Sequence, residues 1–326
     1  MAKLNMVQAI NLALDQQMAK DDTVMIIGED VGLDEGVFRV TAGLIKKYGE
    51  RRVLDTPVAE SGIMGAAIGM AVAGLKPVAE LQFSGFSYHI MHQLESHGVR
   101  LRQRSLGAWH VPVVIRMPYG GGIRALEHHS ESREALYAHL PGVKTVIPST
   151  PRNARALLVA AIQDPDPVIF MEPKRSYRAF KEEVPEEEES MEIGKAQVLQ
   201  EGNDITVIGW GAMMRPILEA VEEAAEKYGA SIELIDLLTI SPMDENCIIK
   251  SVTKTGRVVV VQEAVKTLGP ASEIIAVIND KALMYLEAPV NRVTNYDVIT
   301  PYFNREMSFI PSSGRIRRAI KETLEF

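Results

Sequence analysis

ESGIMGAAIGMAVAG, residues 60–74, predicts a helix whose composition is unusual for a protein surface. Small residues recur along one face at three- and four-residue spacings: Gly62, Gly65, Ala66, Gly69 and Ala73. Each glycine inside a helix costs about 1 kcal/mol relative to alanine, and the close approach of a second helix is the usual compensation. Because Glu60 is the only charged residue of the stretch, we expect a deeply buried helix with this carboxylate at its N-terminus.

Outward from this helix, short β-branched runs alternate with helical stretches along the chain. Expected strands are 24–27, 77–81, 112–117, 145–147, 168–171, 205–208, 232–237 and 258–261. The first expected helix begins after Asn5, near the N-terminus. The others cover 60–73, 85–104, 151–163, 212–227, 270–281 and 313–324. Such alternation is typical of α/β proteins in which mostly parallel sheets are covered by helices on both faces.

The length and one charged segment predict two domains. A chain of 326 residues corresponds to about two domains. Residues 180–190 read FKEEVPEEEES, and a run of like charge usually marks a solvated connection. We therefore expect a first domain over 1–180, an acidic linker over 181–193 and a second domain over 194–326.

Composition excludes several classes of protein. The chain is 46% hydrophobic and 24% charged, which is globular, and its net charge of -8 lacks the footprint of a nucleic-acid-binding protein. A single cysteine, Cys247, excludes an internal disulfide framework and fits a reducing compartment. No apolar run approaches the roughly 20 residues of a membrane span. We expect a cytoplasmic protein, or one of an organelle matrix if a presequence has been removed.

The usual cofactor motifs are absent, although one region is rich in histidine. All seven histidines fall between residues 89 and 139, but no carboxylate completes a zinc set beside His89 and His92. The chain has no GxxxxGK[ST] loop. GWGAMM carries Met214 where a dinucleotide fingerprint needs glycine, and Gly120–Gly122 lacks the spacing of a phosphate cradle.

Five motifs in order carry a resemblance that spans the chain from Asn5 to the last helix. They are IIGEDVG (26–32), DTPVAESGIMGAAIGMAVAG (55–74), AELQFSGFS (79–87), EHHSES (127–132) and HLPGVKTVIPSTP (139–151). Together they resemble the β subunit of the thiamine-diphosphate-dependent decarboxylating component of 2-oxo acid dehydrogenase complexes. The resemblance implies a transketolase-like domain that binds the aminopyrimidine of the cofactor, followed by a C-terminal domain of the transketolase type.

The resemblance assigns roles to three residues of the first domain. Helix physics alone favours Glu60 as a plain N-terminal carboxylate, but the resemblance makes it the group that hydrogen-bonds a ring nitrogen of the aminopyrimidine. There it would exchange the proton that allows the thiazolium carbon to be deprotonated, a task suited to a carboxyl with a raised pKa. Phe86 matches the aromatic position that packs against the aminopyrimidine, and Gln82 lies just before it.

His129 matches a histidine that, in the family, lines the entrance of the active site. There it serves proton transfer and the reductive acylation of the lipoyl group. His128 precedes it, where relatives often carry Gln or Tyr, so the working ring is open between the two. The count of twelve residues to Pro141 favours His129. His139 is interpreted as structural.

A potassium site is also implied, by VPVVIRMP and AAIQDPDP. The ligands in the family are mostly carbonyl oxygens, which suit hard cations. The alternative is a plain helix–strand turn. The matching residues are Val113, Ala161, Ile162, Asp164 and Asp166.

One absence predicts a partner. Thiamine-diphosphate enzymes hold the diphosphate through Mg²⁺ with a GDG motif, and no GDG occurs here. We therefore expect a second polypeptide to supply the Mg²⁺ site. The resemblance implies that this is an α subunit in an α2β2 heterotetramer, and helix 60–73 is a candidate for packing at a two-fold axis.

The expected reaction is decarboxylation of a 2-oxo acid, with transfer of the acyl group to the lipoyl domain of an acyltransferase core. Pyruvate and branched-chain 2-oxo acids both remain open as substrates, and QFSGFS leans towards the latter. The alternatives are an acetoin-cleaving relative, a split transketolase, or an inert scaffold subunit. Retention of Glu60, Phe86 and His129 argues against the scaffold.

Overall fold

The computed structural model describes residues 1–326, which form two compact units. The first unit comprises Met1–Tyr119 and Leu136–Ile193, and the second comprises Gly120–Ala135 and Gly194–Phe326. Residues 120–135 thus group with the second unit, although they lie within the range expected for the first domain. None of the helices combines the length and apolarity that crossing a membrane requires.

The first unit is built on parallel strands in the order β6-β7-β5-β4-β2-β3. Their bounds are β2 Val24–Gly28, β3 Val53–Asp55, β4 Lys76–Glu80, β5 Val114–Tyr119, β6 Lys144–Val146 and β7 Val168–Pro173. Five of the six were predicted within a few residues. The sixth, β3, is three residues long and too short to show a pattern.

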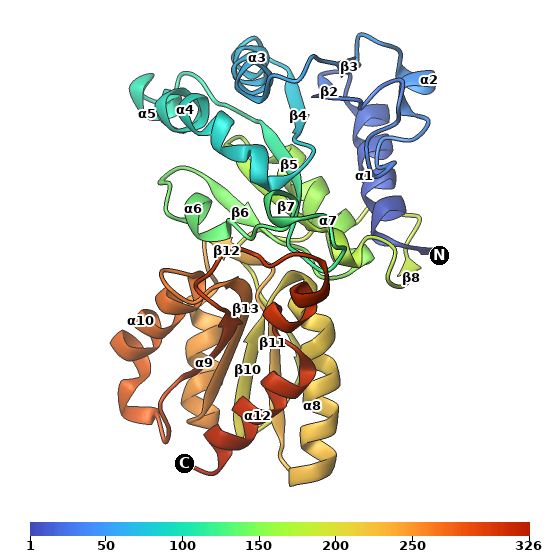
Figure 1. The fold of residues 1–326 in the computed structure, drawn as a ribbon. Helices are drawn as coiled ribbons and strands as arrows, with labels where there is room; N and C mark the ends of the chain where they lie inside the picture. Colours follow the sequence, from blue (N-terminus) through green and yellow to red (C-terminus); the bar gives the residue numbers. More distant parts are fainter. The chain divides into compact units, whose positions relative to one another are not determined.

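Helices cover both faces of this sheet (Figure 1). On one face α1 (Met6–Lys20) and α7 (Pro151–Gln163) lie side by side, and on the other α3 (Glu60–Val72) packs on β2 and β4. Asn5 caps α1 through a reciprocal capping box with Gln8, as expected from its position before the apolar run. Shorter elements are α2 Leu44–Tyr48 and α6 Glu134–Ala138.

The continuous helix expected over 85–104 is wrong. The segment divides into a 3-10 helix η1 (Ser84–Ile90), α4 (Met91–Gln93), a π-type turn η2 (Leu94–Gly98) and α5 (Leu101–Arg104). It packs against α3, where a Cβ added at Gly98 would lie 3.4 Å from Ile68 Cδ1. Because glycine weakens a helix, the segment around Gly98 gives up regular α-helical hydrogen bonding in favour of tight packing on α3.

The deep burial expected for α3 is also wrong for this chain alone. Ile63, Met64, Ala67, Ile68 and Ala71 face the sheet and are buried. The opposite face, with Gly62, Ala66 and Gly69, is exposed, and a Cβ at Gly69 would meet nothing within 4 Å. The apolar composition is therefore only half explained by the packing of this chain.

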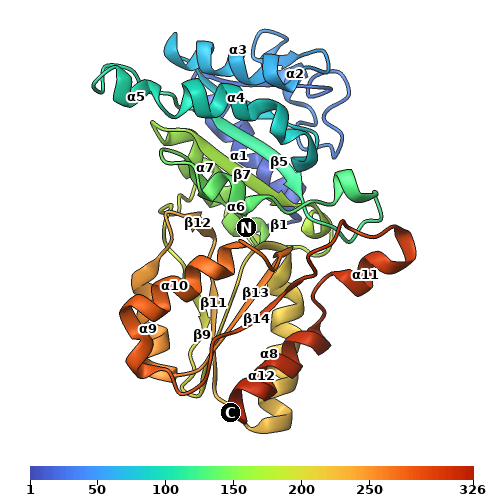
Figure 2. The same ribbon diagram turned by 60° about the vertical axis from the view of Figure 1, so that its left-hand side comes forward.

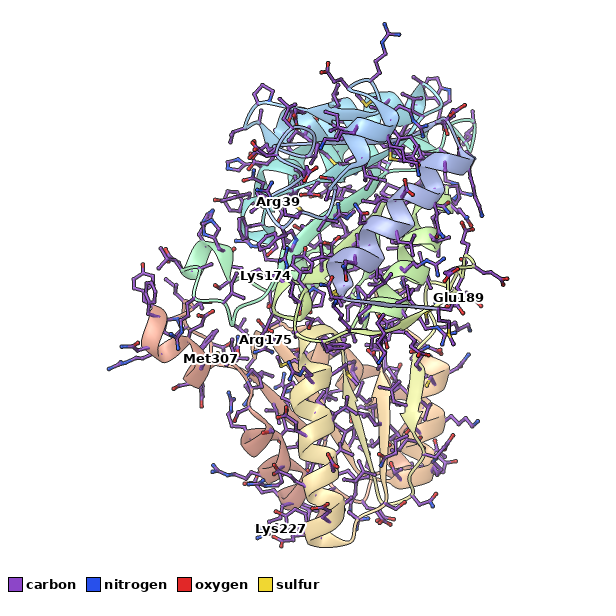
Figure 3. All side chains as sticks on the ribbon, turned by 90° about the vertical axis from the view of Figure 1, so that its right-hand side faces the viewer. Arg39, Lys174, Arg175, Glu189, Lys227 and Met307 are labelled. Atoms are coloured by element: carbon purple, nitrogen blue, oxygen red, sulfur yellow. The ribbon has the colours of Figure 1, made fainter.

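The acidic segment is held firmly by the first unit. β8 (Glu182–Val184) pairs antiparallel with β1 (Ala2–Leu4). The buried Arg155 guanidinium donates to the carbonyls of Pro185, Glu186 and Glu187, and Arg152 forms an ion pair with Glu189, labelled in Figure 3. Several of its carboxylates are solvated, as expected. Its main chain, however, is bound to the first unit by the β1–β8 pairing and by Arg155.

The second unit has a five-stranded sheet in the order β14-β13-β10-β11-β9, parallel except for β9. The strands are β9 Gln197–Gln200, β10 Ile205–Gly209, β11 Ile232–Asp236, β13 Val258–Val265 and β14 Asn291–Asn295. The short strand β12 is Thr239–Ser241. The three predicted strands of this half are confirmed, and the exposed β9 and the half-polar β14 were missed.

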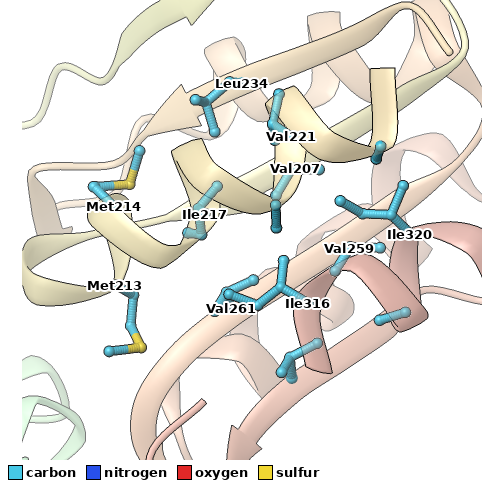
Figure 4. Close-up of a cluster of buried hydrophobic side chains, with 14 of the residues drawn as sticks. Val207, Met213, Met214, Ile217, Val221, Leu234, Val259, Val261, Ile316 and Ile320 are labelled. Atoms are coloured by element: carbon cyan, nitrogen blue, oxygen red, sulfur yellow. The ribbon is translucent and has the colours of Figure 1, made fainter. Parts of the chain in front are cut away.

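Two helices cover each face of this sheet (Figures 1 and 2). α8 (Met214–Tyr228) and α12 (Ser313–Leu324) pack on one face, and α9 (Glu245–Thr255) and α10 (Pro270–Ala282) pack on the other. A short helix, α11 (Glu306–Phe309), precedes α12. The core under α8 and α12 is aliphatic (Figure 4); it includes Val207, Val259, Val261, Ile217, Val221, Ile316 and Ile320.

Candidate functional site

Four of the predicted and newly found residues gather at one edge of the first sheet. Glu29 follows β2, Glu60 follows β3 after a short loop, and Gln82 and Phe86 follow β4. The carboxyl ends of parallel strands meet at one edge, where ligands of open α/β sheets bind. α3 also contacts η1, the segment that carries Phe86. The structure therefore brings Glu60, Gln82 and Phe86 to one edge, as a shared site requires.

Glu60 interacts with a second carboxyl that sequence reasoning missed. Glu60 is half-buried at the start of α3, and Glu29 is 4% exposed with no hydrogen-bond partner for Oε1. Burial and then the charge of Glu60 raise the pKa of Glu29. Two interacting carboxyls favour retention of a proton at this edge. The available signal was the position of Glu29 directly after a fully buried strand.

Gln82 and Phe86 are set by local contacts. Gln82 Nε2 donates to Asp30 Oδ2 at 2.8 Å, and Asp30 has a left-handed φ of 57°. Phe86 lies edge-on to Phe83 at 5.9 Å between ring centroids, and Phe83 lies edge-on to Phe38 at 5.6 Å. This edge of the sheet thus carries aromatic rings together with an amide and two carboxyls. Such a set of groups can bind a planar heteroaromatic ring.

A buried charged network lies under the loop that carries these residues. The Arg116 guanidinium in β5 donates to Glu80 Oε2 at 2.6 Å and to both carboxylate oxygens of Glu172 at 2.6 and 3.0 Å. The Tyr177 hydroxyl donates to Glu172 Oε2 at 2.5 Å. Burial raises the pKa of Glu80 and places that of Tyr177 well above its usual value.

This network joins three neighbouring strands, and the Leu81 amide donates to the Arg116 carbonyl at 2.9 Å. Removing one member would leave an uncompensated buried charge, which is strongly destabilising. The network therefore gives the Gln82–Phe86 loop a rigid base. Sequence reasoning missed it because its members come from strands far apart in the chain.

The residues predicted to bind potassium lie before β5 and at the C-terminal end of α7; they are Val113, Ala161, Ile162, Asp164 and Asp166. Lys144 Nζ donates to both oxygens of Asp164 at 2.5 and 2.6 Å, and Arg102 forms an ion pair with Asp166. Protein cations therefore take both side-chain charges. The carbonyls at a helix C-terminus carry partial negative charge and can still attract a cation. A carbonyl-bound potassium ion stays a prediction.

His128 and His129 belong to the second unit. They lie on the 3-10 turn η3 (Glu127–His129), half-buried, with ring centroids 6.1 Å apart. The Ser130 hydroxyl donates to the Leu126 carbonyl at 2.6 Å and closes the turn. No group of three or more His, Cys, Asp or Glu side chains has the geometry to hold a metal ion. The other five histidines are exposed: His89, His92, His97, His110 and His139.

A buried acid ends the segment that carries these histidines. Glu134 is completely buried, and Trp210 Nε1 donates to its Oε1 at 3.3 Å. Its second oxygen has no hydrogen-bond partner. Burial, with a smaller contribution from the charge of Glu263, raises the pKa of Glu134 to about 7. Glu134 therefore holds a proton far more readily than an ordinary carboxyl.

Comparison with known proteins agrees with the two-part architecture. Residues 2–179 match the family model of the transketolase pyrimidine-binding domain, and residues 194–316 match that of the transketolase C-terminal domain. A solved structure described as a split gene transketolase, inactive beta4 tetramer, is similar in fold, with a TM-score of 0.81 over 99% of both chains at 20% identity. The expected fold class, α/β with two transketolase-like domains, is confirmed.

Sequence relatives are much closer. The chain is 52% identical over 322 residues to the pyruvate dehydrogenase E1 component subunit beta of Acholeplasma laidlawii, covering 99% of this chain and 98% of the relative. It is 48% identical over 326 residues to the protein of the same name from Bacillus subtilis (strain 168), covering 100% of both.

Proposed function

This chain belongs to the transketolase-like family of E1 β subunits, and on that premise we propose that it is the β subunit of a 2-oxo acid dehydrogenase complex's decarboxylating component. Pyruvate is the proposed 2-oxo acid. The observation that carries the proposal is identity of 52% over almost the whole chain with a relative named for pyruvate dehydrogenase. Branched-chain 2-oxo acids are the second candidate, favoured by the QFSGFS motif.

The family depends on thiamine diphosphate, and the residues at the edge of the first sheet fit the aminopyrimidine half of that cofactor. A partly buried carboxyl, an amide and an aromatic wall suit a planar ring with nitrogen donors and acceptors. The unpartnered Glu29 Oε1 beside Glu60 marks a place where a further polar group can be accommodated. When bound, the cofactor supplies the electron sink for decarboxylation.

Each residue of the candidate site has a distinct role in the proposal. Glu60 hydrogen-bonds the ring nitrogen and exchanges its proton, and the neighbouring Glu29, whose pKa is raised, adds a second carboxyl to the site. Phe86 packs against the ring, while Gln82, held by Asp30, lines the site. His129 moves a proton during transfer of the acyl group to the lipoyl group, with His128 as the alternative.

The rest of the site is proposed to come from a partner. An α subunit would supply the Mg²⁺ and diphosphate contacts, because no GDG motif occurs in this chain. The proposed assembly is an α2β2 heterotetramer that delivers acyl groups to the lipoyl domains of an acyltransferase core. A potassium ion held by carbonyls at the end of α7 belongs to the same proposal.

Reconstitution tests the proposal directly. The chain is combined with the α subunit of the same complex. Turnover is measured as decarboxylation of pyruvate and of 2-oxoisovalerate, and as cleavage of acetoin. We expect pyruvate to have the highest kcat/KM. Highest activity with 2-oxoisovalerate would move the substrate to the branched-chain class, and an assembled but inactive tetramer would support the scaffold alternative.

A further inference from the structure

The glycine run 120–122 has no role in the function proposed above, yet it makes two unusual contacts within the second unit. The Gly121 amide donates to Glu263 Oε1 at 2.5 Å, and the Gly122 amide donates to Glu306 Oε1 at 2.6 Å. Each glutamate is 2% exposed. Hydrogen bonds from amides to carboxylates are stronger than those between neutral groups, so the main chain is held here by two buried acceptors.

Glycine is required because the backbone approaches the carboxylates so closely. A Cβ at Gly120, whose φ is +81°, would lie 2.7 Å from Glu263 Oε1. A Cβ at Gly121 would lie 3.0 Å from Glu306 Oε1. The main chain of the run therefore packs directly against two acidic side chains, a role that its spacing did not indicate.

The same contacts close the base of the loop that carries His128 and His129. The Gly120 amide donates to the Glu131 carbonyl at 3.0 Å, which joins the two ends of the loop. Glu306 keeps its Oε2 buried without a hydrogen-bond partner. A buried carboxylate with an unsatisfied oxygen is costly, so this arrangement is not one that stability alone favours.

We infer that Glu263 and Glu306 are positioning residues, which hold the loop by its Gly121 and Gly122 amides and so set where the His128 and His129 rings stand during acyl transfer. What the loop does rests on the proposed function. How the loop is held rests only on contacts within the second unit.

Hydrogen exchange on the full-length chain, followed by mass spectrometry, tests how the loop is held. In Glu306→Ala and Glu263→Ala, amides of the 120–127 peptide should exchange faster, while peptides of α8 stay as in the wild type. Glu306→Gln keeps a carbonyl acceptor and should restore most of the protection. Unchanged exchange of the loop in both alanine variants would overturn the inference.

A second pair of variants disturbs the same contact from the loop side. Gly120→Ala places a Cβ against Glu263 and should also speed exchange of the loop. Gly229→Ala is the matched control, because Gly229 lies in the same unit with φ of +66° but would meet nothing within 4 Å. Faster loop exchange in both variants would show a general response to strain at left-handed glycines, and would contradict the assignment of the effect to the carboxylate contact.

Kinetics of the reconstituted complex test what the loop is held for. In Glu306→Ala we expect acylation of the lipoyl domain to fall roughly 10- to 100-fold, as a small misplacement of a reacting group commonly does. Exchange of the cofactor's thiazolium C2 proton should stay near the wild-type rate. Equal losses in both steps, or no loss of acylation, would contradict the positioning role. A wild-type complex that does not acylate would refute the proposed function and leave the exchange result to decide how the loop is held.

Discussion

Glu60 has a buried carboxyl, that of Glu29, as a neighbour. It starts α3 beside the buried Glu29, whose pKa is raised by burial and by the charge of Glu60. The two carboxyls therefore interact electrostatically, and the interaction favours the protonated form of Glu29. A neutral substitution at Glu60 removes the charge that raises the pKa of Glu29 and, in the proposed function, also removes the group that exchanges a proton with the cofactor.

We predict that Glu60→Gln lowers turnover of the reconstituted tetramer by about 10²–10⁴-fold, the usual cost of losing one acid–base group. The amide keeps the shape of the side chain but cannot exchange its proton in the same way. Steady-state kcat measures the effect, and the size of the assembly should not change. Glu50→Gln, the same change at an exposed position of the first unit, is the control. Wild-type turnover in Glu60→Gln would remove this residue from the mechanism.

The two neighbouring histidines should separate by reaction step. We predict that His129→Ala impairs acylation of the lipoyl domain while exchange of the thiazolium C2 proton persists, because a proton donor acts only at the step it serves. His128→Ala should remain near wild type and is the matched control, since both rings lie half-buried on η3. Single-turnover acylation assays distinguish the variants. A defect confined to His128→Ala would reverse the assignment.

Glu134 should make the stability of the second unit depend on pH. Its pKa is about 7 in the folded chain against 4.5 for an ordinary glutamate, so the folded state binds more protons between these values. Its contribution to stability is full below about pH 4.5 and is lost as pH rises through 7, by about 3 kcal/mol.

We predict that Glu134→Gln, a neutral side chain of the same shape, is more stable than the wild type at pH 8 and gains little at pH 5. Denaturant unfolding of the second unit at both values measures the difference. Equal pH dependence in the variant and the wild type would show that the folded pKa of Glu134 is not raised.

At the residue scale, sequence reasoning found the groups that motifs mark and missed those that depend on tertiary contact. Glu60, Gln82 and Phe86 were predicted, and all three lie at one sheet edge. Glu29 and Arg116 were missed because the residues that they contact or interact with come from other elements. Glu60 starts α3, and Glu80 and Glu172 lie in β4 and β7. No local pattern encodes an ion pair between β4, β5 and β7.

At the element scale, strands with continuous apolar runs were predicted well, and short or polar ones were not. β10 and β13 are buried along almost their whole length and have an obvious pattern. β3 has three residues, and all four residues of β9 are exposed, so neither shows an apolar run. The error over 85–104 has a different origin, because packing on α3 interrupts a segment whose composition is helical.

Packing between β10 and α8 provides a test at this scale. A Cβ at Gly209 would lie 2.2 Å from Ile217 Cδ1 and 3.3 Å from Met214 Sδ. We predict that Gly209→Ala destabilises the second unit by about 1–3 kcal/mol, the usual cost of overpacking a core. Gly314→Ala is the control, because its Cβ would meet only Ser312 Oγ at 3.9 Å. Equal unfolding midpoints in denaturant for both variants would contradict this packing.

At the scale of the whole molecule, the two-domain α/β architecture could be predicted from alternation and length. The exposure of the small-residue face of α3 could not, because composition does not distinguish a helix buried within its own chain from one with an apolar face left open. Val58, next to α3, is 82% exposed. Gly62, Ala66 and Gly69 of the helix are exposed as well. The exposed face is consistent with the proposed heterotetramer, in which a second polypeptide completes the site.

The final prediction concerns cofactor binding by the chain alone. In the proposed function the edge of the first sheet contacts the aminopyrimidine, but the sequence has no GDG motif for Mg²⁺ and the diphosphate. Charge-assisted contacts to phosphate are among the strongest a protein makes, so their absence should leave affinity low. We predict that calorimetric titration of the isolated chain with thiamine diphosphate and Mg²⁺ shows only weak binding, and that adding the α subunit produces tight binding. Glu60→Gln in the same titration shows how much of the residual heat comes from the aminopyrimidine contact. Micromolar affinity without a partner would mean that this chain holds both ends of the cofactor.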